Sequence, residues 1–141
     1  MADNSDPGKL DTGHVYGGQF QPDESNNPRT IIARWVPQGA RVLEVGPGDG
    51  VVGTWLTDNK GCQVVGVEYV AAAAAAAAEH FAHMIVGSIE DTRVQEQVRS
   101  LAPYDAIIFA DVLEHLVDPW GVLSKLRPML KPGGRVLLSV P

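Results

Sequence analysis

The 141-residue chain lacks several features on which whole classes of protein depend. Its single cysteine, Cys62, excludes an internal disulfide and a metal site built from several thiolates. It has no apolar run of about 18 residues, so we expect no transmembrane helix. Its first ten residues are polar and acidic, unlike a secretory signal or a transit peptide, which predicts a soluble cytoplasmic protein.

Basic residues are also scarce. The chain has 11 Lys and Arg against 17 Asp and Glu, for a net charge of −6, and residues 1–24 carry most of that excess. Nothing in the sequence resembles the cluster of Lys and Arg that a nucleic-acid surface requires, so we expect no nucleic-acid partner. A hydrophobic content of 45% with 20% charged residues is ordinary for one soluble globular domain.

Residues 1–27 have no sustained apolar period and are rich in Gly, Asp and Asn, which predicts a flexible acidic N-terminal arm. Within this arm, Val15, Tyr16 and Phe20 are expected to dock on the domain or on a ligand. The folded domain is predicted to span residues 28–141, where Pro28 suits the first turn of a helix that Pro37 ends.

Short apolar runs and helical stretches then alternate along the chain. Strands are predicted at Arg41–Val45, Gln63–Glu68, Met84–Val86, Asp105–Ala110 and Arg135–Val140, and helices at Val51–Asn59, Ala71–Phe81, Thr92–Leu101 and Pro119–Leu130. The strands are apolar at nearly every position, which is typical of a sheet covered on both faces. The alternation therefore predicts an α/β fold with three layers and a doubly wound, mostly parallel sheet.

The first predicted strand runs directly into Gly46-Pro47-Gly48-Asp49-Gly50, and a helix follows. Glycines at this point let the backbone turn tightly and approach a ligand, which binds outside the carboxyl ends of the strands. Glu68 ends the second strand, where its carboxylate can accept both hydroxyls of a ribose. The alternative is a plain turn with Glu68 as a solvated strand end.

The same glycines admit a different ligand. Residues 48–53 fit the pattern G-x-G-x-x-G, which is a weak sign of a dinucleotide such as NAD. Against this, Gly46 and Pro47 separate the pattern from the strand. Glu44 also lies within the strand, where it would repel a pyrophosphate but favour the sulfonium and amino groups of S-adenosylmethionine.

With Glu44, the glycines and Glu68, the chain resembles the class I S-adenosylmethionine-dependent methyltransferases (methyltransferase type 11/12-like domains), whose fold is Rossmann-like. The segments Tyr104–Asp111, Asp111–Pro119 and Leu130–Pro141 resemble the family's fourth strand, the turn after it, and its fifth strand. The resemblance covers residues 28–141.

The resemblance implies S-adenosylmethionine as cofactor and a set of residues that bind it. Glu44 would lie beneath the loop, whose Gly46, Pro47 and Gly48 would pass the methionine part of the cofactor. Asp49 of the same loop would also bind the cofactor. Further cofactor contacts would come from Glu68 to the ribose, from Ser88 and Ile89 to the adenine, and from the carbonyl of Ala110 to the amino group. Ser88 stands where the family often has Asp, and Glu90 is an alternative partner for the adenine. A helix cap is the competing interpretation for both.

The segment Asp111, Glu114 and His115 admits three interpretations. His115 is a candidate for a general base, since an imidazole titrates near neutrality. Alternatively, the three side chains would together bind a divalent cation, as the similar segment does in some ubiquinone-type O-methyltransferases. One histidine and two carboxylates leave this ligand set incomplete, so we predict no metal. The third interpretation, a capping box formed by Asp111 and Glu114, is favoured for Glu114. Asp118 and Pro119 are explained as N-cap and first position of a helix.

The expected function is methyl transfer by in-line displacement to a small-molecule or glycan-precursor acceptor, with no catalytic residue assigned. Family domains usually continue after the fifth strand with a helix and an antiparallel strand pair, so we expect a truncated sheet. Either the chain is a fragment or a second copy covers the strand edge as a homodimer. The alternatives are a domain that binds the cofactor without catalysis, as a sensor or interaction module, and an NAD-binding domain.

Overall fold

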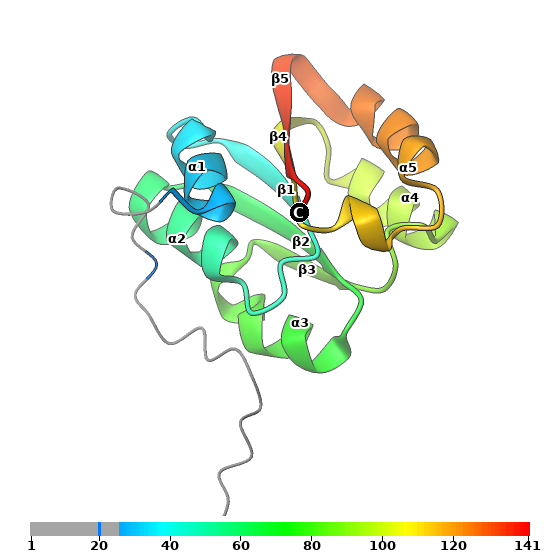
Figure 1. Ribbon diagram of the computed structural model, residues 1–141, viewed down its shortest axis with the longest axis horizontal. Helices are drawn as coiled ribbons and strands as arrows, with labels where there is room; N and C mark the ends of the chain where they lie inside the picture. The colour runs from blue at the N-terminus through cyan, green and yellow to red at the C-terminus, as the bar shows by residue number, and fades with distance from the viewer. Residues whose placement is uncertain (1–19, 21–25) are drawn as a thin grey trace, which may run out of the picture.

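Three layers make up the computed structural model, which describes residues 20 and 26–141 (Figure 1). The central sheet has the order β3-β2-β1-β4-β5, and every neighbouring pair is parallel. Its strands are β1 (Arg41–Val45), β2 (Gln63–Glu68), β3 (His83–Val86), β4 (Tyr104–Ala110) and β5 (Leu130–Ser139). The helices are α1 (Pro28–Trp35), α2 (Val51–Lys60), α3 (Ala71–Ala77), α4 (Thr92–Ser100) and α5 (Pro119–Leu126). The predicted doubly wound α/β fold is confirmed.

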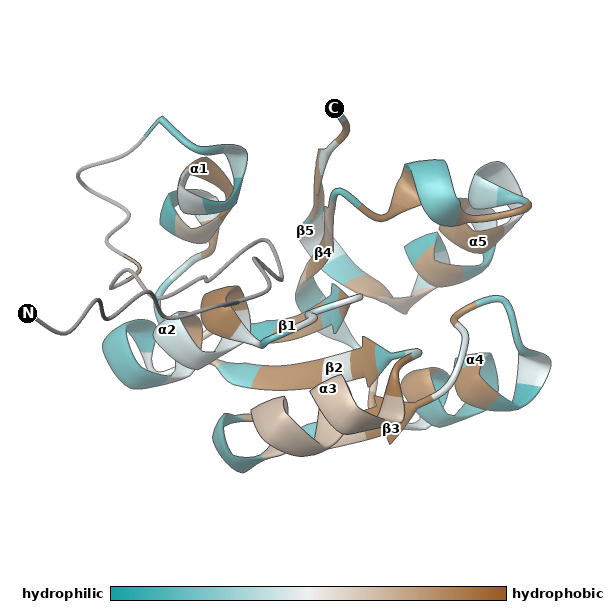
Figure 2. Ribbon diagram, turned by 60° about the horizontal axis from the view of Figure 1, so that its bottom comes forward, coloured by the Kyte–Doolittle hydropathy of each residue, from teal (hydrophilic) through white to brown (hydrophobic). Residues whose placement is uncertain are grey.

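Both faces of the sheet are buried along β1, β2 and β4, which explains why these strands are apolar at nearly every position. Side chains alternate between the faces, so Val42 packs with the layer of α1, α2 and α3, whereas Leu43 and Val45 pack with α4 and α5. Figure 2 shows apolar strands between helices that mix hydrophilic and hydrophobic residues, except for α3, whose alanines are mildly hydrophobic throughout. The core therefore consists of two apolar clusters, one on each side of the sheet.

The alanine-rich helix α3 lies close to α2 because its side chains are small. A Cβ built on Gly50, at the start of α2, would lie 2.7 Å from the Cβ of Ala77. Ala74 and Ala77 are buried in this contact layer. The helix predicted to continue to Phe81 ends at Ala77, and a 3₁₀ turn at Ala78–His80 follows.

Two predicted boundaries near the last strand are wrong. Helix α5 ends at Leu126 and not at Leu130, and a 3₁₀ turn at Arg127–Met129 follows. Pro128 has no N–H to continue the α-helical hydrogen bonds, which accounts for the early end. Strand β5 begins at Leu130 and not at Arg135, because an irregularity in its pairing with β4 accommodates the residues between them.

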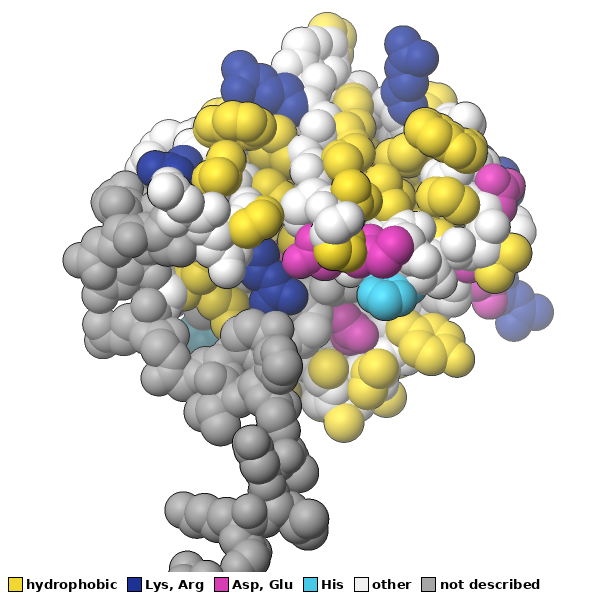
Figure 3. Space-filling view, viewed as in Figure 1, with side chains coloured by type: hydrophobic (Ala, Val, Ile, Leu, Met, Phe, Trp, Pro, Cys, Tyr) yellow, Lys and Arg dark blue, Asp and Glu magenta, His cyan; other side chains and the backbone are white. Residues whose placement is uncertain are grey.

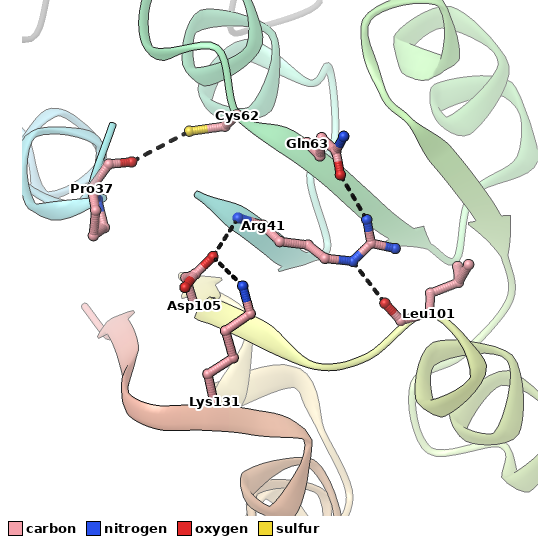
Figure 4. Close-up of polar contacts among 7 residues, drawn as sticks. All are labelled: Pro37, Arg41, Cys62, Gln63, Leu101, Asp105 and Lys131. Atoms are coloured by element: carbon pink, nitrogen blue, oxygen red, sulfur yellow. Dashed lines mark hydrogen bonds and ion pairs between the residues drawn. The ribbon is translucent and has the colours of Figure 1, made fainter. Parts of the chain in front are cut away.

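A polar network joins the strands at the amino end of the sheet (Figure 4). One carboxylate oxygen of Asp105 accepts from the backbone N–H of Arg41 at 2.7 Å and from Lys131 Nζ at 3.1 Å. The hydrogen bond from the backbone N–H of Arg41 and the nearby Lys131 ammonium lower the pKa of Asp105. The Arg41 guanidinium donates to the Leu101 carbonyl and to Gln63. These contacts link β1, β2, β4 and β5 at the amino ends of the strands. A ligand is expected at the opposite, carboxyl ends.

The predicted docking of the N-terminal segment is confirmed for Phe20, whose ring packs edge-on against Trp55 with centroids 6.1 Å apart. Val15, Tyr16 and almost all of the predicted arm lie outside the described residues. Asn27 caps α1 by accepting from the Arg29 N–H at 2.9 Å. Within the described part of the chain, no helix has the length and apolar character needed to span a bilayer.

Candidate functional site

A cavity of about 340 Å³ opens at the carboxyl ends of β1 and β2. This volume lies at the lower end of the range typical of small-molecule sites. Its lining comes from the ends of β1 and β2 with the residue after each, and from the loops that follow β3 and β4: Val45, Gly46, Val67, Glu68, Tyr69, Gly87, Ser88, Ile89, Glu90, Val112, His115 and Leu116. The position agrees with the rule that open parallel sheets bind ligands beyond the carboxyl ends of their strands.

The glycine loop forms one side of the cavity. Gly46 has φ +68°, and its N–H donates to the Val67 carbonyl at 2.8 Å. A Cβ at Gly46 would lie 2.7 Å from Val112 Cγ2, so a larger residue is excluded by sterics as well as by the backbone conformation. Gly48 has φ +58° and faces open space, which leaves its backbone approachable by a ligand.

The Glu68 carboxylate is fixed by two backbone N–H groups, one from the glycine loop and one from the turn after β2. One of its carboxylate oxygens accepts from the Gly48 N–H at 2.9 Å, and the other accepts from the Val70 N–H at 3.1 Å. The residue is buried, although its carboxylate reaches the cavity. Each carboxylate oxygen has two acceptor sites, so one on each remains available for a hydroxyl of a ligand.

Glu44 lies in the neighbouring strand β1, one residue before its end, and its carboxylate points toward Gly53 of α2. It is buried, and its Oε2 atom has no hydrogen-bond partner among the described residues. Burial raises its pKa to about 8, against the opposing effects of the Arg29 charge and the Gly53 amide. A Cβ at Gly53 would lie 2.6 Å from Oε2. Glu44 thus lies beneath the glycine loop, outside the lining of the cavity.

Ser88 and Ile89 line the cavity, as the sequence predicted for residues near the adenine. Ser88 Oγ accepts from the Glu90 N–H at 3.1 Å, and the buried Ile89 offers its carbonyl to Gln95. The cap of α4 is Asp91, which accepts from the Arg93 N–H. The helix-cap interpretation of Ser88 and Glu90 is therefore wrong for α4.

Pro47, Gly48, Asp49 and Ala110 do not line the cavity. Asp49 accepts from the Val51 N–H at 3.3 Å and faces a separate groove between α2 and α3, together with Phe20. Ala110 ends β4 opposite Ser139, the last residue of β5. Their contacts with a cofactor stay predictions.

The segment after β4 differs from the predicted capping box. Asp111 has φ +56°, and its Oδ1 accepts from Ser139 Oγ at 2.8 Å. Glu114 and His115 follow in a 3₁₀ turn that no side chain caps. The predicted capping box is thus wrong, because the Asp111 carboxylate is hydrogen-bonded to Ser139 of the neighbouring strand β5. Asp118 is confirmed as the cap of α5, since its carboxylate accepts from the Gly121 N–H at 2.9 Å.

His115 is brought to the cavity, with a side chain that is 77% exposed and lies 3.7 Å from the Glu114 carboxylate. Within residues 20 and 26–141, no three His, Cys, Asp or Glu side chains are grouped as a metal ion requires.

Six lining residues were not predicted from the sequence: Val45, Val67, Tyr69, Gly87, Val112 and Leu116. Tyr69 and Gly87 directly follow the ends of β2 and β3, so a rule that selects the first residue after each strand finds them. Val112 and Leu116 belong to the irregular turn after β4. Their position depends on the left-handed Asp111, which no periodic pattern reveals.

The cavity has an acidic character. Its charged lining residues in the described part of the chain are Glu68 and Glu90, and no Lys or Arg lines it. Near the middle of the face in Figure 3, acidic side chains lie beside a histidine, with a basic side chain to their left and hydrophobic side chains nearby. Such a lining disfavours a diphosphate and suits a cationic or neutral ligand with hydroxyl groups.

Comparison with known proteins identifies the family to which the chain is similar. A family model described as a methyltransferase domain matches residues 23–141. A ubiquinone biosynthesis O-methyltransferase of Xanthomonas axonopodis pv. citri is 33% identical over 130 residues, which cover 86% of this chain and 53% of the relative. A namesake in Pseudomonas aeruginosa is 29% identical, with coverage of 86% and 54%. The chain thus spans about half the length of the curated relatives it matches.

Solved structures share the fold. A TehB-like SAM-dependent methyltransferase from Corynebacterium glutamicum superimposes with a TM-score of 0.62 at 22% identity, over 79% of this chain and 60% of the other. The glycopeptide N-methyltransferase MtfA, complexed with S-adenosyl-L-methionine, gives a TM-score of 0.60 at 20% identity, over 79% and 51%.

Proposed function

The chain belongs to the S-adenosylmethionine-dependent methyltransferase family, and we propose that its cavity binds S-adenosylmethionine for methyl transfer to an acceptor. The observation that carries the proposal is the Glu68 carboxylate, which the Gly48 and Val70 amides fix in an acidic cavity. A fixed carboxylate binds a pair of ribose hydroxyls without further loss of side-chain freedom.

The residues present fit this cofactor. Glu44 has a buried oxygen without a partner among the described residues, and a cation near the loop would compensate its charge. When bound, S-adenosylmethionine supplies a methyl group activated by a positive sulfonium. Pro47, Gly48, Asp49 and the Ala110 carbonyl are proposed to border the methionine part, whereas Ser88 and Ile89 border the adenine.

The chain's own residues would act mainly by orientation. Alignment of acceptor and methyl group is worth up to roughly 7–11 kcal/mol of the barrier in well-oriented reactions. His115 lies at the rim, where it is proposed to remove a proton from the acceptor hydroxyl or amine. We propose a small-molecule or glycan-precursor acceptor. Among the relatives, the ubiquinone biosynthesis enzymes are named O-methyltransferases and the glycopeptide enzyme an N-methyltransferase.

Parallel calorimetric titrations with S-adenosylmethionine, S-adenosylhomocysteine and NAD test the cofactor. We expect binding of the first two and none of NAD, because the acidic lining opposes a pyrophosphate. Binding of NAD alone would refute the proposal. Binding of the methyl donor without turnover over a broad acceptor panel would instead favour the second candidate, a domain that binds the cofactor without catalysis.

The replacement His115→Ala is expected to leave the affinity for S-adenosylhomocysteine nearly unchanged while lowering kcat by about 100-fold, the lower range for a general base. The side chain is largely exposed at the rim, so the cofactor loses little contact. Cofactor affinity is measured by calorimetry and kcat with the acceptor that the panel identifies. His80→Ala, in the separate groove between α2 and α3, is the matched control. A large loss of cofactor affinity in His115→Ala would assign the residue to the cofactor site.

Two further predictions remain untested, a cytoplasmic location and a homodimer in which a second copy covers the exposed edge of the sheet. Strand β5 does form an edge, and Val136, Leu138 and Val140 are exposed on or beside it. Such an edge is available for pairing with another strand.

A further inference from the structure

Glu90 connects two loops that the sheet topology keeps apart. It belongs to the loop after β3, whereas residues 111–118 follow β4. In the sheet, β2 and β1 separate those two strands. A contact between the loops must therefore span the carboxyl ends of β2 and β1, which form the floor of the cavity with Val45, Gly46, Val67 and Glu68.

The contact is made by both oxygens of the Glu90 carboxylate. Oε1 accepts from the Asp118 N–H at 2.9 Å, and Oε2 accepts from the Val117 N–H at 3.3 Å. These two amides directly precede α5, where the positive end of the helix dipole also favours a carboxylate. A carboxylate accepts one N–H on each of its two oxygens, whereas a Gln side chain offers a single acceptor oxygen because its amide nitrogen is a donor.

Both loops supply walls of the cavity. Gly87, Ser88 and Ile89 come from the first loop, and Val112, His115 and Leu116 come from the second. Glu90 is itself anchored, because its N–H donates to Ser88 Oγ. The carboxylate thus ties the two walls to each other through the backbone of the second loop.

We propose that Glu90 is a positioning residue that holds these two loops at the spacing the cofactor requires. This inference rests on the proposed function, since the first wall carries Ser88 and Ile89, which are proposed to border the adenine, and the second carries His115, which is proposed to act on the acceptor. Without the carboxylate the loops would sample wider arrangements. The apparent affinity would then fall in proportion to the fraction of molecules with the loops correctly spaced.

The test compares Glu90→Ala and Glu90→Gln with wild type. Calorimetry with S-adenosylhomocysteine is expected to show a Kd about tenfold higher in Glu90→Ala, the scale of one charge-assisted hydrogen bond. Glu90→Gln keeps one acceptor oxygen and is expected to lie between the two. Glu96→Ala, on the exposed surface of α4, removes the same charge without touching the cavity and should leave the Kd unchanged.

Amide hydrogen exchange supplies a measurement that does not depend on the cofactor. We expect faster exchange at the Val117 and Asp118 amides in Glu90→Ala, with unchanged exchange at Ile107 and Phe109 in the core of β4.

Two outcomes overturn the proposal. A purely structural role of Glu90 would lower the Tm but leave the Kd unchanged at temperatures well below the Tm, and that outcome overturns the proposal. A higher Kd with unchanged exchange at the two amides also overturns it, because Glu90 would then contact the ligand directly. If wild type bound no S-adenosylhomocysteine, the proposed function would fail, while the exchange data would still report on the link between the loops.

Discussion

Glu44→Gln is expected to abolish a large loss of stability that the wild-type protein suffers as the pH rises. The Glu44 carboxyl is fully buried, and burial raises its pKa from the usual 4.5 to about 8 in the folded protein. Between about pH 4.5 and about pH 8, the folded state therefore holds a proton that the unfolded chain has released. The free energy of unfolding falls as the pH rises through this window and is constant above it.

The size of the effect follows from the size of the pKa shift. A shift of this extent corresponds to a loss on the order of 5 kcal/mol. The charge of Arg29 and the Gly53 amide already oppose the shift, whereas Asp49 and Glu68 add to it. A Gln at this position carries no charge at any pH in the window, so its contribution to stability does not change.

Urea denaturation at a series of pH values from about 5 to about 9 measures this difference, with cofactor excluded. Wild type should lose stability toward the alkaline end, and Glu44→Gln should remain nearly level. Glu79→Gln removes a carboxylate from an exposed position after α3 and should follow the wild-type curve. Parallel curves for wild type and Glu44→Gln would show that Glu44 is ionised at low cost, in contradiction to its burial without a partner for Oε2.

Glu68→Ala is expected to weaken the binding of S-adenosylhomocysteine by about 1–3 kcal/mol, the usual cost of losing a charge-assisted hydrogen bond. The substitution removes the proposed acceptor for the ribose hydroxyls. It also leaves the Gly48 and Val70 amides without the carboxylate that orients them. Glu79→Ala is the control for the loss of charge at an exposed site.

An analogue of S-adenosylhomocysteine without the ribose 2′-hydroxyl separates the direct contribution from the indirect one. Wild type should bind this analogue more weakly than the parent compound, whereas Glu68→Ala should bind the two with nearly equal affinity. This double comparison isolates the pairwise interaction between the carboxylate and the hydroxyl. Unchanged affinity for the parent compound in Glu68→Ala would remove Glu68 from the ribose site.

Much of this architecture follows from local patterns. Strands β1 and β2 have the predicted bounds, and β3 and β4 differ from prediction by one residue each. Their continuous apolar runs reflect burial on both faces, which is a property of each strand by itself. The boundaries around α5 and β5 were harder to predict, because Pro128 and the irregular pairing of β5 act through hydrogen bonds that periodicity does not reveal.

Within the candidate site, the sequence indicated the residues whose position follows from a strand end. Gly46, Glu68, Ser88 and Ile89 were predicted, and all of them line the cavity. The sequence left Glu90 between a helix cap and an adenine ligand, and in the structure it links two loops through the Val117 and Asp118 amides. The separation of 27 and 28 residues between these partners gives no periodic signal.

By itself, the sequence determined the class of fold, the glycine loop and the family, because strand burial and backbone conformation at glycine are local properties that single segments record. Only the tertiary structure decided the orientation of the acidic side chains. The Glu44 carboxyl is buried under the loop, and its pKa is raised. The Asp111 carboxylate accepts a hydrogen bond from Ser139, and the Glu90 carboxylate accepts one from Asp118 in the loop after β4. Each of these results depends on a partner from another strand or loop, so it is fixed when the layers pack and not before.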